Sequence, residues 1–298
     1  MKDSRYEQAA AILPVRLRRL ALNVAEEERE RTEEFRLRAG RGFTLVLPEG
    51  ERELDAEVTA EEVELLCDLA TSFSRYASTE TVREGFISVE GGFRVGLCGT
   101  AVMKEGGITN VKNISSAAVR IAREFKGAGE EAAQALFHDG TYCSTLLYSP
   151  PGGGKTTLLR DLVRVLSDGI GVPPQRVALV DERGEVAAMH RGQAQMDVGR
   201  RTDVLDACPK ALGIPMVLRA MNPRIIAVDE ITAREDIRAM TYAAGCGVGL
   251  LATVHAGSRE EILEKPLYRE MMETGVFSKG IRICREKGQR RYIVEELE

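Results

Sequence analysis

The run at 149–157, Ser-Pro-Pro-Gly-Gly-Gly-Lys-Thr-Thr, has the residue types that bind a phosphate group. Its glycines let the backbone curl so that several N–H groups point into one hollow. Lys155 supplies a positive charge for the outer phosphates, and the hydroxyl of Thr156 is a ligand for Mg²⁺. Ser149 stands where the usual pattern has its first glycine, but the crowded end of the loop keeps its glycines. The expected nucleotide-binding residues are Pro150, Pro151, Gly152, Gly153, Gly154, Lys155, Thr156 and Thr157.

Polar residues also stand at the ends of three later apolar runs, 177–180, 225–228 and 250–254. The residues at these ends are Asp181, Glu182 and Glu185, then Asp229 and Glu230, then His255. The phosphate loop itself lies between an apolar run and a helical pattern, which is the strand–loop–helix context that such a loop needs. Continuous apolar runs separated by helical segments predict a buried parallel sheet, in which ligands bind beyond the carboxyl ends of the strands. We therefore expect these strand ends to meet at one nucleotide site.

Each of these groups has a role in nucleotide chemistry and a plainer structural alternative. Asp229 is expected to hold Mg²⁺ directly or through water, and Glu230 to activate the attacking water. An acidic pair at this point can instead cap a helix. One carboxylate of the cluster at 181–185 is expected to assist, and its spacing does not say which. His255 can face the phosphates as a donor, or serve as an ordinary structural histidine.

Arginines between and before the acidic motifs are candidates for a contact between subunits. Arg219 is the best of them for reaching the γ-phosphate that a neighbouring subunit holds, and the alternative is a surface ion pair. The further candidates are Arg200 and Arg201 and, on the N-terminal side, Arg94, Arg120 and Arg123.

The first part of the chain predicts a separate, smaller domain. Helices are expected at 1–34 and 60–78, and strands at 35–38, 43–47, 85–89, 93–98 and 119–122. Gly127 and Gly129 mark a plausible hinge. These patterns predict an α+β domain at 1–126 and a P-loop NTPase domain of the RecA/AAA type at 127–298, which ends in a short hairpin.

Composition narrows the class of protein. The chain has 298 residues, a net charge of −5, no tryptophan and 5% aromatic residues, so nothing favours bulk nucleic-acid binding. Its six cysteines include no Cys-x-x-Cys pair, which is typical of reduced thiols without a zinc site. The N-terminus is not a signal peptide, and no uncharged run approaches the ~20 residues of a membrane span. A cytoplasmic protein that meets a membrane only through partners is expected.

The order of the motifs resembles the traffic ATPases of the type II and type IV secretion superfamily. Their Walker A loop, Asp box, Walker B strand and His box correspond to 149–157, 181–185, 225–230 and 249–255. Arg219 lies in a run that looks like the arginine-bearing segment before their Walker B strand. The resemblance implies an ATPase that uses ATP and Mg²⁺ and assembles as a homo-oligomer.

A closer resemblance covers nearly the whole chain. The runs at 85–96, 119–124, 150–161 and 180–185 are similar to the stage III sporulation protein AA family. That likeness implies the ATPase of a channel complex between mother cell and forespore. It also implies a hexameric ring on the mother-cell side, docked to membrane proteins of the complex.

Two other functions stay open at this point. One is a nucleic-acid motor, which the acidic balance and the lack of an aromatic and basic stripe disfavour. The other is a structural ring that binds ATP only in order to assemble, which the Asp229-Glu230 pair disfavours.

Overall fold

The computed structural model describes residues 4–71, 85–104, 107–286 and 289–297. The chain forms two compact units, unit 1 comprising Met1–Arg123 and Ala188–Gln195, and unit 2 comprising Glu124–Ala187 and Met196–Glu298. The boundary expected from the sequence followed residue 126, whereas the division in the structure follows Arg123. The segment Ala188–Gln195 belongs to unit 1 although it lies within the sequence of unit 2, so no single boundary separates the two units.

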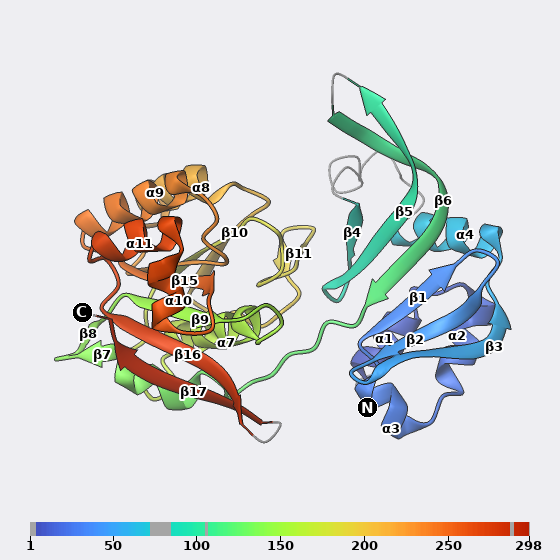
Figure 1. The fold of residues 1–298 in the computed structure, drawn as a ribbon, viewed down its shortest axis with the longest axis horizontal. Helices are drawn as coiled ribbons and strands as arrows, with labels where there is room; N and C mark the ends of the chain where they lie inside the picture. The colour runs from blue at the N-terminus through green and yellow to red at the C-terminus, as the bar shows by residue number, and fades with distance from the viewer. Residues whose placement is uncertain (1–3, 72–84, 105–106, 287–288, 298) are drawn as a thin grey trace. The chain divides into compact units, whose positions relative to one another are not determined.

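Unit 1 is built on one antiparallel sheet of order β3-β2-β1-β6-β5-β4 (Figure 1). Its core joins one face of this sheet to the helices α1, α2 and α4, with Phe35 and Phe43 fully buried between them. Its elements are α1 (Arg5–Ala10), α2 (Val15–Leu22), α3 (Glu26–Arg31), β1 (Glu34–Arg38), β2 (Gly42–Leu47), β3 (Gly50–Glu57), α4 (Ala60–Ala70), β4 (Phe86–Val89), β5 (Phe93–Lys104), β6 (Gly107–Arg120), β11 (Met189–His190) and β12 (Gln193–Ala194).

The hairpin expected around the Gly91-Gly92 turn is confirmed, because β4 and β5 pair there in antiparallel register. The helix expected at 60–78 is confirmed over α4, and the rest of that expectation lies outside the described residues. The helical segment expected at 1–34 forms, within the described residues 4–34, three short helices separated by turns. The strand β3, which is rich in glutamate, was not predicted, because this edge strand is largely exposed and lacks an apolar pattern.

Unit 2 contains the parallel sheet that the apolar runs predicted, in the order β13-β10-β14-β15-β9-β16-β17 (Figure 1). All neighbouring pairs are parallel except the terminal hairpin of β16 and β17. Its elements are α6 (Glu130–Ala133), η1 (Gln134–Leu136), β7 (Phe137–His138), β8 (Thr141–Tyr142), β9 (Thr145–Ser149), α7 (Lys155–Asp168), β10 (Val177–Asp181), β13 (Thr202–Asp206), α8 (Lys210–Met221), β14 (Ile225–Val228), α9 (Arg234–Gly245), β15 (Gly249–His255), α10 (Arg259–Glu264), α11 (Pro266–Glu273), β16 (Lys279–Glu286) and β17 (Gln289–Glu296).

Alternation along the central strands gives this sheet two buried faces. Alternate strand residues such as Tyr148, Val180 and Val254 share one apolar cluster with α8, α9, α10 and α11. The helix α7 lies outside that cluster and packs against β9, β10 and β15 with buried leucines and valines. Helices therefore cover both faces of the sheet, as the uninterrupted apolar strands require. No helix in the described part of the chain combines the length and the apolar character needed to cross a membrane.

Candidate nucleotide-binding site

The loop between β9 and α7 has the curled backbone that its glycines predict. Gly152 and Gly154 have φ angles of 72° and 102°, a left-handed region that side chains disfavour. At Gly153 a Cβ atom would lie 2.1 Å from the Ser149 hydroxyl oxygen and 3.0 Å from the carbonyl oxygen of Pro150. The buried serine in the usual place of a first glycine therefore fits because Gly153 has no side chain.

Lys155 begins α7 and is almost fully buried, with 6% of its surface exposed. Its Nζ donates to the carbonyl oxygens of Ser149 and Pro150, at 3.0 and 3.2 Å, and lies 2.7 Å from Nδ1 of His255. Burial lowers the pKa of Lys155, while the carboxylates of Asp229 and Glu230 act in the opposite direction. The ammonium group thus occupies a place where little water and several acceptors surround it.

Thr156 and Asp229 meet at the start of α7. The Thr156 hydroxyl donates to Oδ2 of Asp229 at 2.7 Å, and the Thr253 hydroxyl donates to Oδ1 at the same distance. The Thr253 oxygen also accepts the N–H of Glu230 at 2.8 Å. Thr253 lies two residues before His255 on β15, so alternation turns both side chains to the same face. Sequence reasoning did not select Thr253, although a hydroxyl at this spacing within an apolar strand was a usable signal.

Glu230 follows β14 with a φ of 48°, a left-handed conformation that is uncommon for a residue with a side chain. Its Oε1 lies 3.1 Å from Nε2 of His255, and its Oε2 accepts from Arg183 at 2.7 Å. Since Lys155 donates to Nδ1, the proton of a neutral His255 ring is assigned to Nε2, which then faces the glutamate. The four side chains form one continuous chain of polar contacts. Arg183 was missed from the sequence because it carries no signal apart from its place in the acidic cluster.

The carboxylates at 181–185 separate into three environments. Asp181 is 1% exposed and accepts the N–H groups of Glu185, Val186 and Ala187 at 2.8–3.0 Å. Burial raises the pKa of Asp181, although these three N–H groups favour its charged form. Glu182 pairs with Lys210 of α8. Glu185 lines the same cavity as Asp229 and Glu230, so it is the member of the cluster that can meet a bound nucleotide.

The acidic loop is also fixed to α7. Arg160 donates to the carbonyl oxygens of Glu185 and Val186, at 2.6 Å each. Burial lowers the pKa of the Arg160 guanidinium, and surrounding carboxylates oppose that shift. A movement of α7 would therefore be transmitted directly to the loop that carries Glu185. The sequence gave no reason to single out Arg160, whose spacing on α7 is that of an ordinary helix residue.

A cavity of about 360 Å³ joins these groups at the carboxyl end of the sheet. It is lined by Gly152, Gly154, Lys155, Thr156, Thr157, Glu185, Asp229, Glu230, Thr253, His255 and Arg290. The structure thus brings together residues from β15, the phosphate loop, the acidic loop and the segment that follows β14. Pro150 contributes its carbonyl oxygen to Lys155, Pro151 is exposed, and neither proline is among the lining residues.

The candidate arginines lie elsewhere. Arg219 is exposed on α8 and does not line the cavity of its own chain. Arg200 pairs with Asp168, and Arg201 donates to the carbonyl oxygen of Ser167. The unit 1 arginines contact their own unit, since Arg94 covers the Phe86 ring, Arg120 pairs with Glu34, and Arg123 donates to the carbonyl oxygens of Arg29 and Thr32.

The donor set fits Mg²⁺ bound together with a nucleotide. Among the described residues no group of three or more His, Cys, Asp or Glu side chains could hold a metal alone. Mg²⁺ is usually bound by one or two carboxylates, with waters and substrate phosphates completing its coordination. The adjacent hydroxyl of Thr156 and carboxylate of Asp229 match that requirement, and the curled loop offers its N–H groups to phosphate oxygens.

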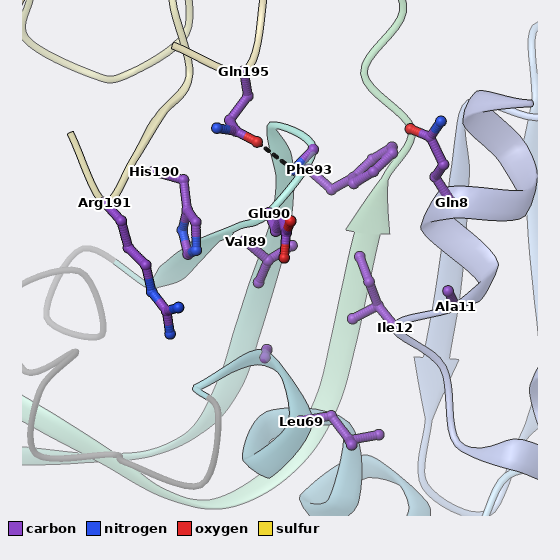
Figure 2. A pocket seen from close by; sticks show the side chains of 12 residues that line it. Gln8, Ala11, Ile12, Leu69, Val89, Glu90, Phe93, His190, Arg191 and Gln195 are labelled. Atoms are coloured by element: carbon purple, nitrogen blue, oxygen red, sulfur yellow. Dashed lines mark hydrogen bonds between the residues drawn. The ribbon is translucent and has the colours of Figure 1, made fainter. Parts of the chain in front are cut away.

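A larger cavity, about 630 Å³, lies within unit 1. Figure 2 shows His190, Arg191 and Gln195 along one side of it and Gln8, Ala11 and Ile12 along the other. Oε1 of Gln195 accepts the N–H of Gly91 at 2.7 Å, which joins the segment Ala188–Gln195 to the turn between β4 and β5. This cavity has neither a glycine loop nor paired carboxylates, so the candidate site is the smaller one.

Unit 2, a parallel sheet with a glycine loop between β9 and α7, has a P-loop fold. The structure is similar to that of the Legionella pneumophila ATPase DotB, with a TM-score of 0.60, 16% identity and coverage of 95% of this chain and 80% of that one. It is also similar to the pilus retraction motor PilT with bound ADP, with a TM-score of 0.56, 15% identity and coverage of 88% and 77%. At these identities the likeness concerns the fold.

The sequence comparisons identify the family. The model of the family "Sporulation stage III, protein AA" matches residues 3–294, so the chain belongs to that family. The stage III sporulation protein AA of Bacillus subtilis strain 168 is 34% identical over 282 residues, which cover 94% of this chain and 92% of that protein. The resemblance stated from the sequence motifs is therefore confirmed.

Proposed function

We propose that this protein is an Mg²⁺-dependent ATPase that works as a homo-oligomeric, hexameric ring. It powers or assembles a secretion-like channel between mother cell and forespore, on the mother-cell side and attached through membrane proteins of that channel. The ring and the channel rest on membership of the sporulation family and on the likeness to secretion ATPases. The chemistry rests on the site.

One observation carries the chemical part of the proposal. Lys155, the pair Asp229-Glu230 and His255 follow or end three different strands, β9, β14 and β15, and line one cavity with the glycine loop. Structural roles alone, such as helix capping, would not require all of them to face the same space. Phosphoryl transfer does require a cation at the phosphates, a metal ligand and a group that orients water around one reacting phosphorus.

Each group of residues at the site has its own role in this proposal. The N–H groups of the loop and Nζ of Lys155 bind the phosphates, which replace the carbonyl contacts that Lys155 makes here. Thr156 and Asp229 hold Mg²⁺, which neutralises charge on the β- and γ-phosphates when it is bound. Glu230 accepts a proton from the attacking water as the water oxygen bonds to the γ-phosphorus and the bond to the bridging oxygen breaks. Glu185 assists from the acidic loop.

We infer that His255 reports the γ-phosphate. It contacts the phosphate-binding Lys155 through Nδ1 and the carboxylate of Glu230 through Nε2. If a γ-phosphate draws Lys155 away, the imidazole of His255 loses its contact at Nδ1. Its contact with the carboxylate of Glu230 through Nε2 then changes as well. This is a route by which the bound nucleotide sets the readiness of the base.

The test is phosphate release by the purified full-length protein with Mg²⁺ and ATP. Glu230→Gln should lower turnover by about 100-fold or more while ATP binding is kept, because a positioned base typically contributes at least that factor. Lys155→Ala should lose ATP binding. Glu235→Gln, the same change on the exposed first turn of α9, is the matched control and should leave turnover unchanged. Normal turnover of the Glu230 variant would remove Glu230 as the base, and ATP binding without any turnover in the unaltered protein would favour a structural ring.

A further inference from the structure

The terminal hairpin runs past the end of the strand that it pairs with (Figure 1). β16 pairs with β9 from Lys279 opposite Thr145 to Arg282 opposite Tyr148, and β9 ends one residue later at Ser149. The rest of β16 and the beginning of β17 therefore project beyond the sheet, on the side where the phosphate loop begins. This overhang, residues 283–286 and 289–291 among those described, is rich in arginine.

One arginine of the overhang lies against the loop. A Cβ atom on Gly154 would be 3.0 Å from both Cζ and Nε of Arg290, so the guanidinium covers the last glycine before Lys155. The φ of 102° at Gly154 favours glycine, and the absence of a side chain there lets the guanidinium approach the loop closely. Arg290 also lines the candidate cavity, to which it is the single contributor from the terminal hairpin within the described residues.

Arg290 is in no ion pair within the part of the chain that the structure describes, although Glu185, Asp229 and Glu230 line the same cavity. Its guanidinium lies over the ring of Phe125, 6.0 Å from the ring centroid. Arg291, the next residue, points to the other face of the strand, where its Nη1 lies 2.9 Å from the carboxylate of Glu286. A guanidinium that faces a phosphate-binding cavity without an acidic partner is suited to an anionic ligand.

The sheet order indicates which part of the ligand Arg290 meets. β15 and then β14 lie on one side of β9, and β16 and β17 on the other. Glu230 and His255, the groups assigned to the attacking water and the γ-phosphate, come from the β14 and β15 side. The α- and β-phosphates are held over the glycines and the helix start, next to Gly154.

We propose that Arg290 binds the α- and β-phosphates of a nucleoside di- or triphosphate from the terminal hairpin. The inference rests on the proposed function, since it adds a ligand to the same site. It makes the hairpin a sensor of any nucleotide that carries a diphosphate, ADP as well as ATP. The proposed γ-phosphate contacts on the other flank distinguish the two nucleotides.

Equilibrium binding to the full-length protein tests the assignment without turnover. Isothermal titration with ADP should give a dissociation constant about tenfold higher for Arg290→Gln than for the unaltered protein, the usual loss when one charge-assisted contact to phosphate is removed. Arg291→Gln is the matched control, with the same change of charge one residue away, and should change the constant less than twofold. Arg290→Lys should fall between, since it keeps the charge but not the planar fork.

Pyrophosphate is the second probe, and it separates a phosphate contact from a base contact. A weaker binding of both ADP and pyrophosphate by Arg290→Gln supports the proposal. Weaker ADP binding with unchanged pyrophosphate binding would assign Arg290 to the base and overturn it, as would equal constants for the two glutamine variants. An unaltered protein that binds no ADP would overturn the proposed function itself. Thermal unfolding without ligand checks that each variant is folded.

Discussion

Lys155 carries its charge in a place that excludes most of the surrounding water. Burial disfavours the ammonium form and lowers its pKa, and the nearby carboxylates only partly restore it. Below its lowered pKa, Lys155 is charged in the folded and unfolded states, and its desolvation destabilises the folded state in full. As pH rises from the lowered pKa toward the ordinary lysine value of about 10.4, the folded side chain loses its proton first and this destabilisation is relieved. A bound polyphosphate would raise the pKa of Lys155 again, because it supplies negative charge at Nζ.

The first prediction concerns the titration of Lys155. The rate of its acetylation, followed by mass spectrometry as a function of pH, should have a midpoint below the ordinary lysine pKa, and ATP with Mg²⁺ should move that midpoint upward. Lys126 is an internal comparison, since its hydrogen bond to Asp197 raises its pKa and its midpoint should lie higher. A Lys155 midpoint equal to that of Lys126 would contradict the account.

Thr253 provides the second prediction at this scale. It orients Asp229 and at the same time accepts the N–H of Glu230. Thr253→Val keeps the shape but removes both bonds, so the Mg²⁺ concentration for half-maximal ATP turnover should rise about tenfold, a typical effect of losing a group that orients a metal ligand. Thr253→Ser keeps the hydroxyl and should stay near the unaltered value. Equal Mg²⁺ dependence in the two variants would leave Thr253 without this role.

At the scale of single residues, sequence alone reached the groups that end apolar strands or follow glycines. Lys155, Asp229 and His255 stand at such places, and the structure brings them to one cavity. Arg183 and Arg290 were out of reach for a different reason. Their positions depend on how strands pair and turn, and many arginines in this chain have equivalent local surroundings.

Among the elements, α8 shows how closely a helix of unit 2 packs on its sheet. A Cβ atom on Gly213 would lie 2.6 Å from Cγ1 of Val180 on β10 and 3.1 Å from a methyl group of Leu205. Glycine inside a helix normally costs about 0.5–1 kcal/mol relative to alanine. Here the close approach to β10 explains why the glycine is tolerated.

The third prediction follows from this contact. Gly213→Ala should destabilise the protein by about 1–3 kcal/mol, the usual cost of overpacking, despite the better helix propensity of alanine. The midpoint of thermal unfolding should fall accordingly, by roughly 2–4 °C per kcal/mol for a unit of this size. At Gly245, on α9, an added Cβ meets nothing within 4 Å, so Gly245→Ala is the control and should be neutral or slightly stabilising. A stabilised Gly213 variant would show that α8 moves away from the sheet easily.

Burial decides which strands of the unit 2 sheet could be predicted from the sequence. The central strands β9, β10, β14 and β15 have nearly continuous apolar sequences because both faces are covered, and such runs are visible in the sequence. The terminal hairpin was also predicted, from its two β-rich runs. The strand β13 was not, because this edge strand is partly exposed and its sequence, Thr-Asp-Val-Leu-Asp, mixes polar and apolar residues.

For the whole molecule, the exposed Arg219 provides a test of assembly and the fourth prediction. If Arg219 completes the site of a neighbour, Arg219→Ala and Lys155→Ala should each abolish ATP turnover when pure. A mixture should recover activity, because about a quarter of the interfaces in a randomly mixed ring join an intact site to an intact arginine. Phosphate release at several protein concentrations, with native mass, measures this recovery.

Three results would contradict this picture of shared sites. Full turnover by the Arg219 variant alone would remove the arginine from the chemistry. A mixture no more active than the sum of its parts would show that Arg219 does not act across subunits. Turnover per chain that is independent of protein concentration would also count against a ring whose subunits complete one another.

The segment Ala188–Gln195 has a practical consequence for anyone who wishes to study the two units apart. Because the backbone returns to unit 1 there and leaves it again, severing the chain at one peptide bond cannot release either unit whole. A fragment starting at Glu124 would carry the strands β11 and β12 with nothing to pack on. A fragment ending at Arg123 would lose the Gln195 amide that satisfies Gly91. A cut after Arg123 and replacement of Ala188–Gln195 by a short turn would therefore give unit 2 alone, whereas unit 1 would also have to carry the segment Ala188–Gln195.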